Sequence, residues 1–399
     1  MKKWLIGVLV LLLGLAGVGL LVLDQRAKQL EQALSESQQQ LKRMQRGYLP
    51  NSTKKETSQK VESNTVTVDL TSTPANMELL PTLDSPSNAK NRLWVGTFQL
   101  VWNDLMDELV KGPVKLNVPM VTLLNQQAFT TADLSESAYY KKWGKASPAL
   151  REEIEQGIKD KFNETSDVLH LVDWNQPQDP LYSRYILYAM LKKDFSFVEP
   201  LDKLNEEEFK GSNGLVKYFG IKNGTAFQVR KSVHVLFYNG ENDFAVMLKS
   251  KQGDEVYLYR TNDDKTLDRL YADMLQKDTQ TDDYVGVNDY FKAPMIDFKI
   301  LREFTEVCGQ EFPLYNPEIG ESAHIEKAIE TAQFKMDETG VRIKSEAIIG
   351  MMASGGAYHE RPVVQHRYFY LDDSYVIFIK ETGKKPYFAM RVTDAKALQ

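Results

Sequence analysis

The stretch Phe334-Lys335-Met336-Asp337-Glu338-Thr339-Gly340-Val341-Arg342-Ile343 changes character twice within a short distance. It begins as the end of a strand-like run at 325–336. Acidic residues and glycine then interrupt the run, and these residues favour turns over strands. Alternation of apolar and polar residues resumes at Val341. The sequence therefore predicts a strand, a hinge formed by Glu338, Gly340 and Val341, and a second strand-like segment.

The segment that follows the hinge has two distinct faces, because neighbouring side chains of a strand point in opposite directions. One face is apolar or small, at Val341, Ile343, Ser345, Ala347, Ile349 and Met351. The other face is largely polar, at Arg342, Lys344, Glu346, Ile348 and Gly350. This pattern suits a strand with one buried face. The segment either lies in a sheet from the start or enters one after cleavage, and its bulky residues favour permanent insertion.

Working outward from the hinge, the remaining patterns predict an α+β fold. Apolar helical faces at 98–109, 148–162 and 267–275 predict helices. Asn239-Gly240 between apolar runs predicts a hairpin. Residues 185–191 form a short apolar element, and strands are expected at 233–238, 244–248, 256–259, 295–300, 368–371, 375–380 and 387–392. Helices that come first and antiparallel strands that follow are typical of the α+β class.

The order of these C-terminal elements resembles a serpin over the last 70 residues. The resemblance rests on the Asp-Glu-Thr-Gly hinge at 337–340 and on two closing runs, Ser-Tyr-Val-Ile-Phe-Ile-Lys at 374–380 and Phe-Ala-Met-Arg-Val at 388–392. It implies a mixed domain with a long exposed loop at 341–368. It also implies that a protease would cut that loop near Ser354 and Gly355. Strand insertion would then trap the protease.

Several positions depart from the serpin pattern. Serpin hinges carry small residues that let the loop slip into the main sheet, whereas 341–346 is bulky or charged here. Ala389 stands where glycine is usual, and Ser374 where proline is usual. The loop is longer and the domain shorter than in a typical serpin. These departures favour a scaffold that does not inhibit.

The N-terminal part predicts export and membrane attachment. Residues 4–23 contain no charged side chain and are long enough to span the hydrocarbon core, so 1–24 is read as an uncleaved anchor; a cleaved signal is the alternative. Residues 25–46 read as a stalk helix, with a weak homodimer through its heptad seam as the alternative. Residues 47–92 read as a flexible tether and 93–399 as the folded domain. The expected location is a cell membrane, with the domain outside the cytoplasm.

Composition narrows the partners and the chemistry. A net charge of −6 gives no electrostatic basis for nucleic-acid binding. Cys308 is the single cysteine, so an intrachain disulfide is excluded. The low cysteine content and the exported anchor favour a bacterial source. No nucleophile elbow, phosphate loop or zinc-helix motif is present, and the five histidines are scattered. We therefore expect no cofactor, no metal and no catalytic activity.

Three functions remain open from the sequence. The favoured one is a non-inhibitory binding or structural module that presents a surface to a partner protein. The second is a protease inhibitor that acts through cleavage and insertion of the 341–368 loop, with a protease or another surface protein as partner. The third is an unrecognised enzyme of the cell envelope, which would show a pocket where polar side chains converge.

Overall fold

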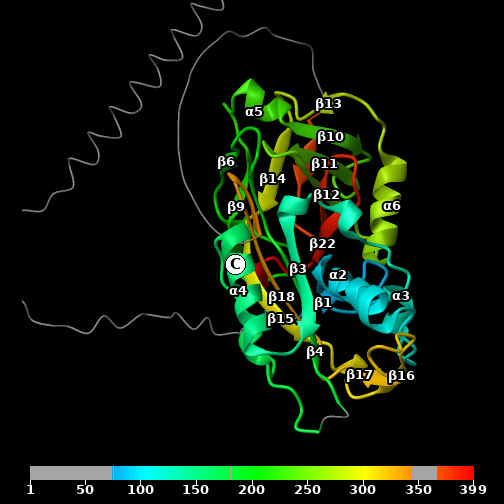
Figure 1. Ribbon diagram of the computed structural model, residues 1–399. Helices are drawn as coiled ribbons and strands as arrows, with labels where there is room; N and C mark the ends of the chain where they lie inside the picture. Colours follow the sequence, from blue (N-terminus) through cyan, green and yellow to red (C-terminus); the bar gives the residue numbers. More distant parts are fainter. Residues whose placement is uncertain (1–73, 75, 180–181, 344–365) are drawn as a thin grey trace, which may run out of the picture. The chain divides into compact units, whose positions relative to one another are not determined.

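The computed structural model describes residues 74, 76–179, 182–343 and 366–399. All of these belong to one compact unit, which spans 68–399. Helices and several β-sheets share this unit, and the longer helices fall in its first two thirds (Figure 1). The α+β class predicted from the sequence is confirmed.

The largest sheet has eight strands and contains the two closing runs of the chain. In spatial order, its strands are β1 (Met77–Leu80), β2 (Asn91–Val95), β22 (Pro386–Val392), β21 (Tyr375–Glu381), β12 (Asp254–Arg260), β11 (Phe244–Lys249), β10 (Val233–Tyr238) and β13 (Asp283–Tyr284). Its central strands are apolar on both faces: every residue of β22 is buried, as are all but one of β21. Strands covered on both sides need such continuous apolar runs. The predicted hairpin at Asn239-Gly240 joins β10 to β11.

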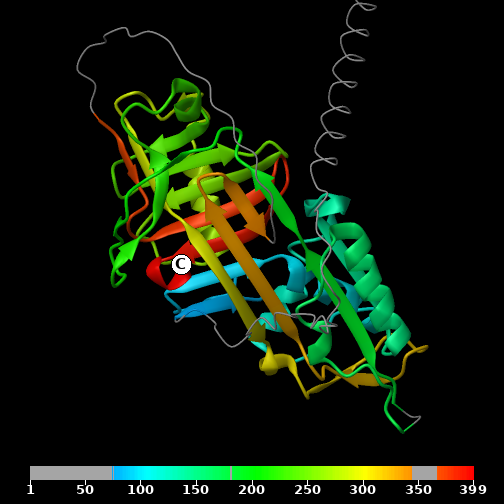
Figure 2. The ribbon, with the colours of Figure 1, turned by 90° about the vertical axis from the view of Figure 1, so that its left-hand side faces the viewer.

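A second sheet contains the hinge. Its strands are β15 (Ile296–Glu303), β18 (Ile329–Asp337), β19 (Gly340–Ile343) and β5 (Lys193–Ser196). Figure 2 shows the short β19 between the long β18 and the green strand β5. Residues 341–343 thus lie in the sheet, as their alternation predicts. The strand predicted at 325–336 starts later, because Ile325 forms an isolated bridge with Cys308 instead.

The remaining strands form one four-stranded sheet and three ribbons. The sheet contains β20 (Tyr368–Tyr370), β14 (Tyr290–Pro294), β9 (Tyr218–Ile221) and β6 (Asp202–Lys203). The ribbons pair β3 (Tyr139–Lys145) with β4 (Tyr185–Leu191), β16 (Glu311–Pro313) with β17 (Ser322–His324), and β7 (Glu207–Glu208) with β8 (Leu215–Val216). A single residue separates β4 from β5, so the two follow each other as nearly one continuous strand (Figure 2).

The three helices predicted at 98–109, 148–162 and 267–275 are present, and two short helices were not predicted. The α-helices are α2 (Thr97–Asp104), α3 (Pro119–Leu124), α4 (Pro148–Phe162), α5 (Phe227–Lys231) and α6 (Leu267–Lys277). A π-helical turn, η1 (Leu105–Val110), extends α2, and short 3₁₀ turns lie at η2 (Thr131–Asp133), η3 (Glu136–Ala138), η4 (Leu169–Leu171), η5 (Thr305–Val307) and η6 (Lys396–Leu398). Helix α4 begins where Ser147 Oγ accepts the Leu150 N–H, with Pro148 in the first turn. It ends at Asn163 in the left-handed conformation.

The N-terminal boundary of the folded part differs from the expected one. Met77–Leu80 lies inside the stretch 47–92 expected as a tether, yet it forms the edge strand β1, parallel to β2. Leu79 and Leu80 are buried there. A short stretch with three apolar residues can form a strand when an existing sheet offers an unpaired edge. Among the described residues no helix is long and apolar enough to span a membrane. The expected anchor (1–24) and stalk (25–46) lie outside the described residues.

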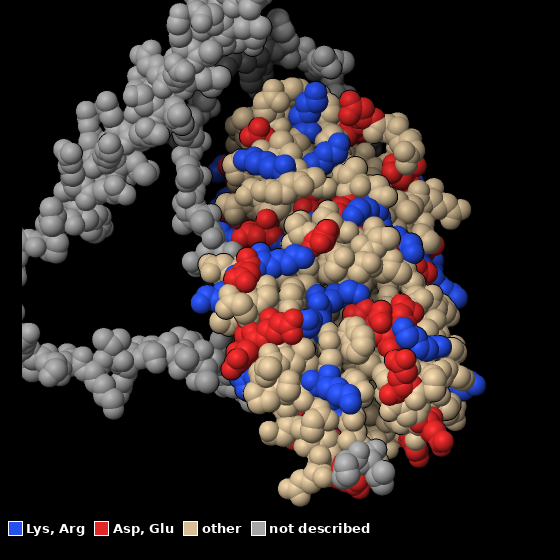
Figure 3. Space-filling model, in the orientation of Figure 1, with Lys and Arg blue, Asp and Glu red and all other residues tan. Residues whose placement is uncertain are grey.

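Charged side chains are mixed on the surface. On the face shown in Figure 3, basic and acidic residues alternate over short distances and are separated by uncharged ones. Nucleic-acid binding requires a continuous basic stripe or patch. The described residues on this face form none, which agrees with the negative net charge of the whole chain.

Candidate functional site

The hinge forms a tight turn, and its two central carbonyl groups accept hydrogen bonds from a segment that lies beside it in the fold. Asp337 pairs with Gly340, so only Glu338 and Thr339 lie between β18 and β19. The Thr339 carbonyl accepts the N–H of Phe197 at 3.0 Å, and the Glu338 carbonyl accepts that of Leu201 at 2.8 Å. These bonds come from the segment that follows β5. The turn is therefore fastened to the same strand against which β19 packs.

Gly340 lies where no side chain fits. A Cβ atom built on it would lie 2.2 Å from the Phe195 carbonyl oxygen and 2.8 Å from the Ser196 Cα. Both atoms belong to the β5 backbone, which cannot swing aside as a side-chain end can. The glycine predicted at the hinge is therefore required by the close approach of β19 to β5.

The first residues after the hinge occupy the faces predicted for them. Val341 is fully buried and Ile343 nearly so. Arg342 points outward, with its Nε 3.9 Å from an oxygen of Asp194. The bulky and charged residues at 341–343 thus have places in the sheet, because the apolar ones face the core and the charged one faces solvent.

Beyond β19, two strand edges lack a partner strand within the described part of the chain. Strand β18 pairs with β19 from Lys335 to Asp337, and on that side its residues 329–334 have no partner strand among the described residues. Strand β4 pairs with β3 on one side and has no strand recorded on the other. We call these two edges the open edges. Because β19 lies between β18 and β5, and β5 continues β4, a strand extending past Ile343 would run between them.

A buried charge network underlies β5 at the point where β19 ends. Lys193, the partner of Ile343 in the ladder, reaches Asp254 at 2.8 Å and Glu381 at 2.6 Å. Glu381 also accepts the N–H and hydroxyl of Ser135. Burial alone would raise the pKa of Glu381, but the bonds from Lys193 and Ser135 outweigh it and lower that pKa to about 2. A polar cavity of about 390 Å³ opens beside this network.

Acid should therefore weaken the domain through Glu381. Because its pKa is depressed in the folded state, the stabilisation is present above the ordinary carboxyl range and is lost as pH falls from about 5 toward about 2. The shift corresponds to about 3 kcal/mol in the free energy of unfolding. Glu381→Gln should show a flatter fall of melting temperature over this interval than the wild type. The exposed Glu155→Gln on α4 is the control and should keep the wild-type slope.

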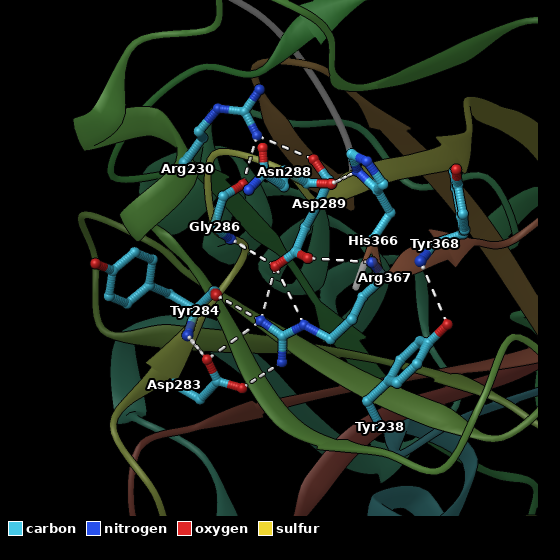
Figure 4. Close-up of polar contacts among 10 residues, drawn as sticks. All are labelled: Arg230, Tyr238, Asp283, Tyr284, Gly286, Asn288, Asp289, His366, Arg367 and Tyr368. Carbon is cyan, nitrogen blue, oxygen red and sulfur yellow. Dashed lines mark hydrogen bonds and ion pairs between the residues drawn. The ribbon is translucent and has the colours of Figure 1, made fainter. Parts of the chain in front are cut away.

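The other end of the 344–365 segment is fastened by Arg367 (Figure 4). Its guanidinium donates to Asp283 at 2.5 Å and to Asp289 at 2.7 Å. Asp289 is only 5% exposed, and it also accepts the backbone N–H groups of Gly286 and Arg367. Its own carbonyl accepts a bond from the buried Arg230. The point where the described chain resumes is thereby tied to the turn between β13 and β14.

Aromatic side chains cover the surface around this attachment. Tyr290 on β14 stacks on Tyr368 of β20, with ring centroids 5.5 Å apart and 8° between planes. Tyr370 and the exposed His366 continue the row along β20. On the other side of the Arg367 cluster, Phe227 is 58% exposed and packs against Tyr284, and Val287 is 75% exposed. We call this set of six ring side chains and Val287 the aromatic surface. Exposed aromatic residues held rigidly are common at protein–protein contacts.

The residues predicted from the sequence divide into two groups. Glu338, Gly340 and Val341 come together at the hinge, where Glu338 also pairs with Lys203 at 3.2 Å. Ser354 and Gly355, the expected cleavage site, lie outside the described residues. No set of three or more metal-binding side chains converges among the residues described.

Sequence reasoning missed the charged residues that support the hinge and the attachment at Arg367. Asp283 pairs with Arg367, although nothing in the sequence around Asp283 indicates this partner. No sequence pattern marked Lys193 as a residue with buried ion-pair partners. The sequence does mark Glu330 on β18: it breaks the apolar face formed by Ala332, Phe334 and Met336, and a charge at a buried strand position marks a special site.

Comparisons with known proteins add a likeness of fold only. No family model and no curated protein matches the sequence. The solved structures that resemble it are serpins. They include Serpin48 of the insect Tenebrio molitor (12% identity, TM-score 0.42, 76% of this chain and 92% of that chain). Thyroxine-binding globulin in complex with thyroxine (10%, 0.45, 77% and 93%) and human glycosylated kallistatin (11%, 0.43, 77% and 92%) also match. All three TM-scores are below 0.5, so the likeness carries no conclusion about activity.

Proposed function

We propose that the domain is a non-catalytic protein that captures a partner, most directly a protease, by inserting its own chain as a β-strand. The observation that carries this proposal is the four-residue β19 beside the open edges of β18 and β4. A membrane anchor at 1–24 would hold the domain outside the cytoplasm, where it meets exported proteases or other surface proteins.

The ladder register shows how the next residues would fit. Continuing the register past Ile343, residues 344–348 would run beside β18 as far as Ile329, and residues 344–351 would run beside β4 as far as Tyr185. Ser345, Ala347, Ile349 and Met351 would then follow Val341 and Ile343 on the buried face. Strands gain stability when such a face is covered and both edges are paired. The two open edges and the sequence of 344–351 are therefore complementary.

The bulk of the hinge residues no longer argues against insertion. The sequence favoured a non-inhibitory module because Val341, Arg342 and Ile343 are larger than serpin hinges allow. Their side chains fit the sheet without conflict, with two buried and one outside. In this proposal, 344–351 enters the sheet only after the chain is cut.

The second candidate is a binding module with a fixed loop. It is favoured by the buried Val341 and the bonds that fasten Glu338 and Thr339, since these already hold the hinge in place. In this case the aromatic surface beside His366 would be the contact area for a partner protein, and cutting the chain would release no stored strain.

Limited proteolysis followed by thermal melting tests the two candidates. We expect a cut of the full-length chain within 351–358 to raise the melting temperature, because 344–351 is then free to fill the open edges. The same cut should leave a complex with the attacking protease that survives SDS. A cut that leaves the melting temperature unchanged would contradict insertion and support the fixed module.

A pair of variants separates insertion from cleavage. Ala347→Glu places a charge on the face that would be buried, so the chain should still be cut but should gain no thermal stability and trap no protease. Lys344→Glu changes the charge on the outer face three positions earlier and should behave as the wild type. Equal behaviour of the two variants would refute the predicted register.

A further inference from the structure

The edge of β5 that faces away from β19 is paired on both sides of Asp194 but open at Asp194 itself. On the side of β19, the Phe197 N–H donates to the Thr339 carbonyl at 3.0 Å. Because the hydrogen-bonding groups of successive residues in an antiparallel pair point to alternate sides, Asp194 and Ser196 direct theirs away from β19. The Ser196 carbonyl meets a partner there, since it accepts the Lys251 N–H at 2.9 Å. The turn between β11 and β12 therefore closes this edge as far as Ser196.

The ribbon of β3 and β4 closes the same edge from the other direction. The Lys192 N–H donates to the Ala138 carbonyl at 2.9 Å, which continues the β3–β4 ladder by one step. The next step of this register would place Glu136 opposite Asp194. The chain instead turns away in η3, and the residue before η3 donates two hydrogen bonds to Glu381. Among the described residues, none bonds the N–H or carbonyl group of Asp194 on this side. We call this interruption the β5 gap.

The polar cavity of about 390 Å³ lies at the β5 gap, and Asp194 is one of the residues that line it. Ser137 and Gly253 line it from the two turns that border the gap. This volume lies within the range of roughly 300–1,000 Å³ that is usual for ligand sites. An unpaired strand N–H and carbonyl offer a template to which the main chain of another peptide can bond. The cavity therefore suits an extended peptide residue.

The charges at the β5 gap favour a cationic side chain. A residue paired with Asp194 would place its side chain on the same face as that of Asp194, with Cβ atoms about 5 Å apart. Among the described residues, Arg342 is the only cation within ion-pair distance of the Asp194 carboxylate, at 3.9 Å. Lys192 is engaged by Glu164 at 3.1 Å, and Lys193 by Asp254. Burial raises the pKa of Asp194, and the charges of Arg342 and Lys192 lower it only in part. The Asp194 carboxylate thus lacks a close cation.

We propose that the β5 gap binds a short peptide, one residue of which pairs with Asp194 through two main-chain hydrogen bonds and bears a lysine or arginine side chain. The paired residue donates its N–H to the Asp194 carbonyl and accepts the Asp194 N–H. Its cationic group lies beside the Asp194 carboxylate. Because Ala138 and Lys251 already occupy the edge on either side, only a few residues of a peptide fit. The site lies on the edge of β5 opposite to β19, so it needs neither cleavage of the chain nor strand insertion.

Calorimetric titration of the detergent-solubilised full-length chain with N-acetyl-Ala-Lys-Ala-amide tests the site. The matched depsipeptide, in which an ester oxygen replaces the lysine N–H, cannot donate to the Asp194 carbonyl and should bind about fivefold more weakly. Norleucine in place of the probe's lysine keeps the main chain and removes the charge, and should weaken binding about threefold. In Asp194→Asn the lysine and norleucine peptides should bind equally.

Amide hydrogen exchange, measured residue by residue, locates the bound probe. At saturation, exchange of the Asp194 amide should slow several-fold, whereas the Lys192 amide, which already has a partner, should not change. Binding without protection of Asp194 would overturn the site, and so would an absence of binding at millimolar probe, which would mean that the gap holds water alone. Equal affinity of the peptide and the depsipeptide would overturn the main-chain pairing. Equal affinity of the lysine and norleucine peptides for the wild type would overturn the charge preference.

Discussion

Gly340→Ala is expected to displace β19 from the sheet and to lower the free energy of unfolding by about 4 kcal/mol, because two buried side chains lose their places. The added methyl group would lie 2.2 Å from the Phe195 carbonyl oxygen, so β19 or β5 must move. Val341 and Ile343 are buried only while β19 stays where it is. Hydrogen exchange of the Val341 and Ile343 amides should become fast in the variant, and the melting temperature should fall.

A strand glycine elsewhere provides the control for this prediction. Gly144 on β3 also has ordinary backbone angles, but a Cβ there would meet only the end of the Leu150 side chain, at 3.3 Å. Gly144→Ala should therefore change the melting temperature little and leave β19 protected. If Gly340→Ala behaved like Gly144→Ala, the close packing of β19 on β5 would be incorrect.

The hinge could be predicted from the sequence because all of its signals are local. A strand-like run, a turn and a second alternating segment follow one another within a few residues, and each has its own backbone preference. The alternation even assigned the buried face correctly, with Val341 and Ile343 inward and Arg342 outward. The closing strands were equally clear, since β21 and β22 are continuous apolar runs.

The supporting charges could not be predicted in the same way, because their partners are far apart in the chain. Arg367 meets Asp283 and Asp289 across about 80 intervening residues. Nothing in the local pattern of either segment indicates the other. Strand β1 was missed for a related reason: its four residues become a strand only because β2 offers a parallel edge.

The open edges likewise depend on tertiary structure. The sequence indicated that 341–352 suits a sheet, but it gave no sign of which strands would border it or where they would lack a partner. Only the ladder shows that, among the described residues, β18 and β4 extend beyond the pairs made with β19. The choice between insertion and a fixed loop therefore depends on pairing of strands that are distant in sequence.

Arg367→Gln is expected to cost about 3 kcal/mol, because it leaves the buried Asp289 without its cation. The Asp289 side chain keeps the backbone N–H groups of Gly286 and Arg367, so the fold should survive. The loss should be concentrated at β20 and the turn before β14, since the guanidinium joins these two segments. Local hydrogen exchange there, together with the melting temperature, measures the effect.

Arg184 is a matched control for Arg367, because it too bridges two carboxylates. Its partners Asp173 and Glu326 are 54% and 49% exposed, whereas Asp289 is 5% exposed. Exposed pairs contribute at most about 1 kcal/mol, so Arg184→Gln should have a small effect. Burial, and not the number of ion pairs, should decide the difference between the variants. Equal losses would mean that Arg367 does not fasten β20, and the return of the 344–365 segment would then have to be held by the stacking of Tyr290 on Tyr368.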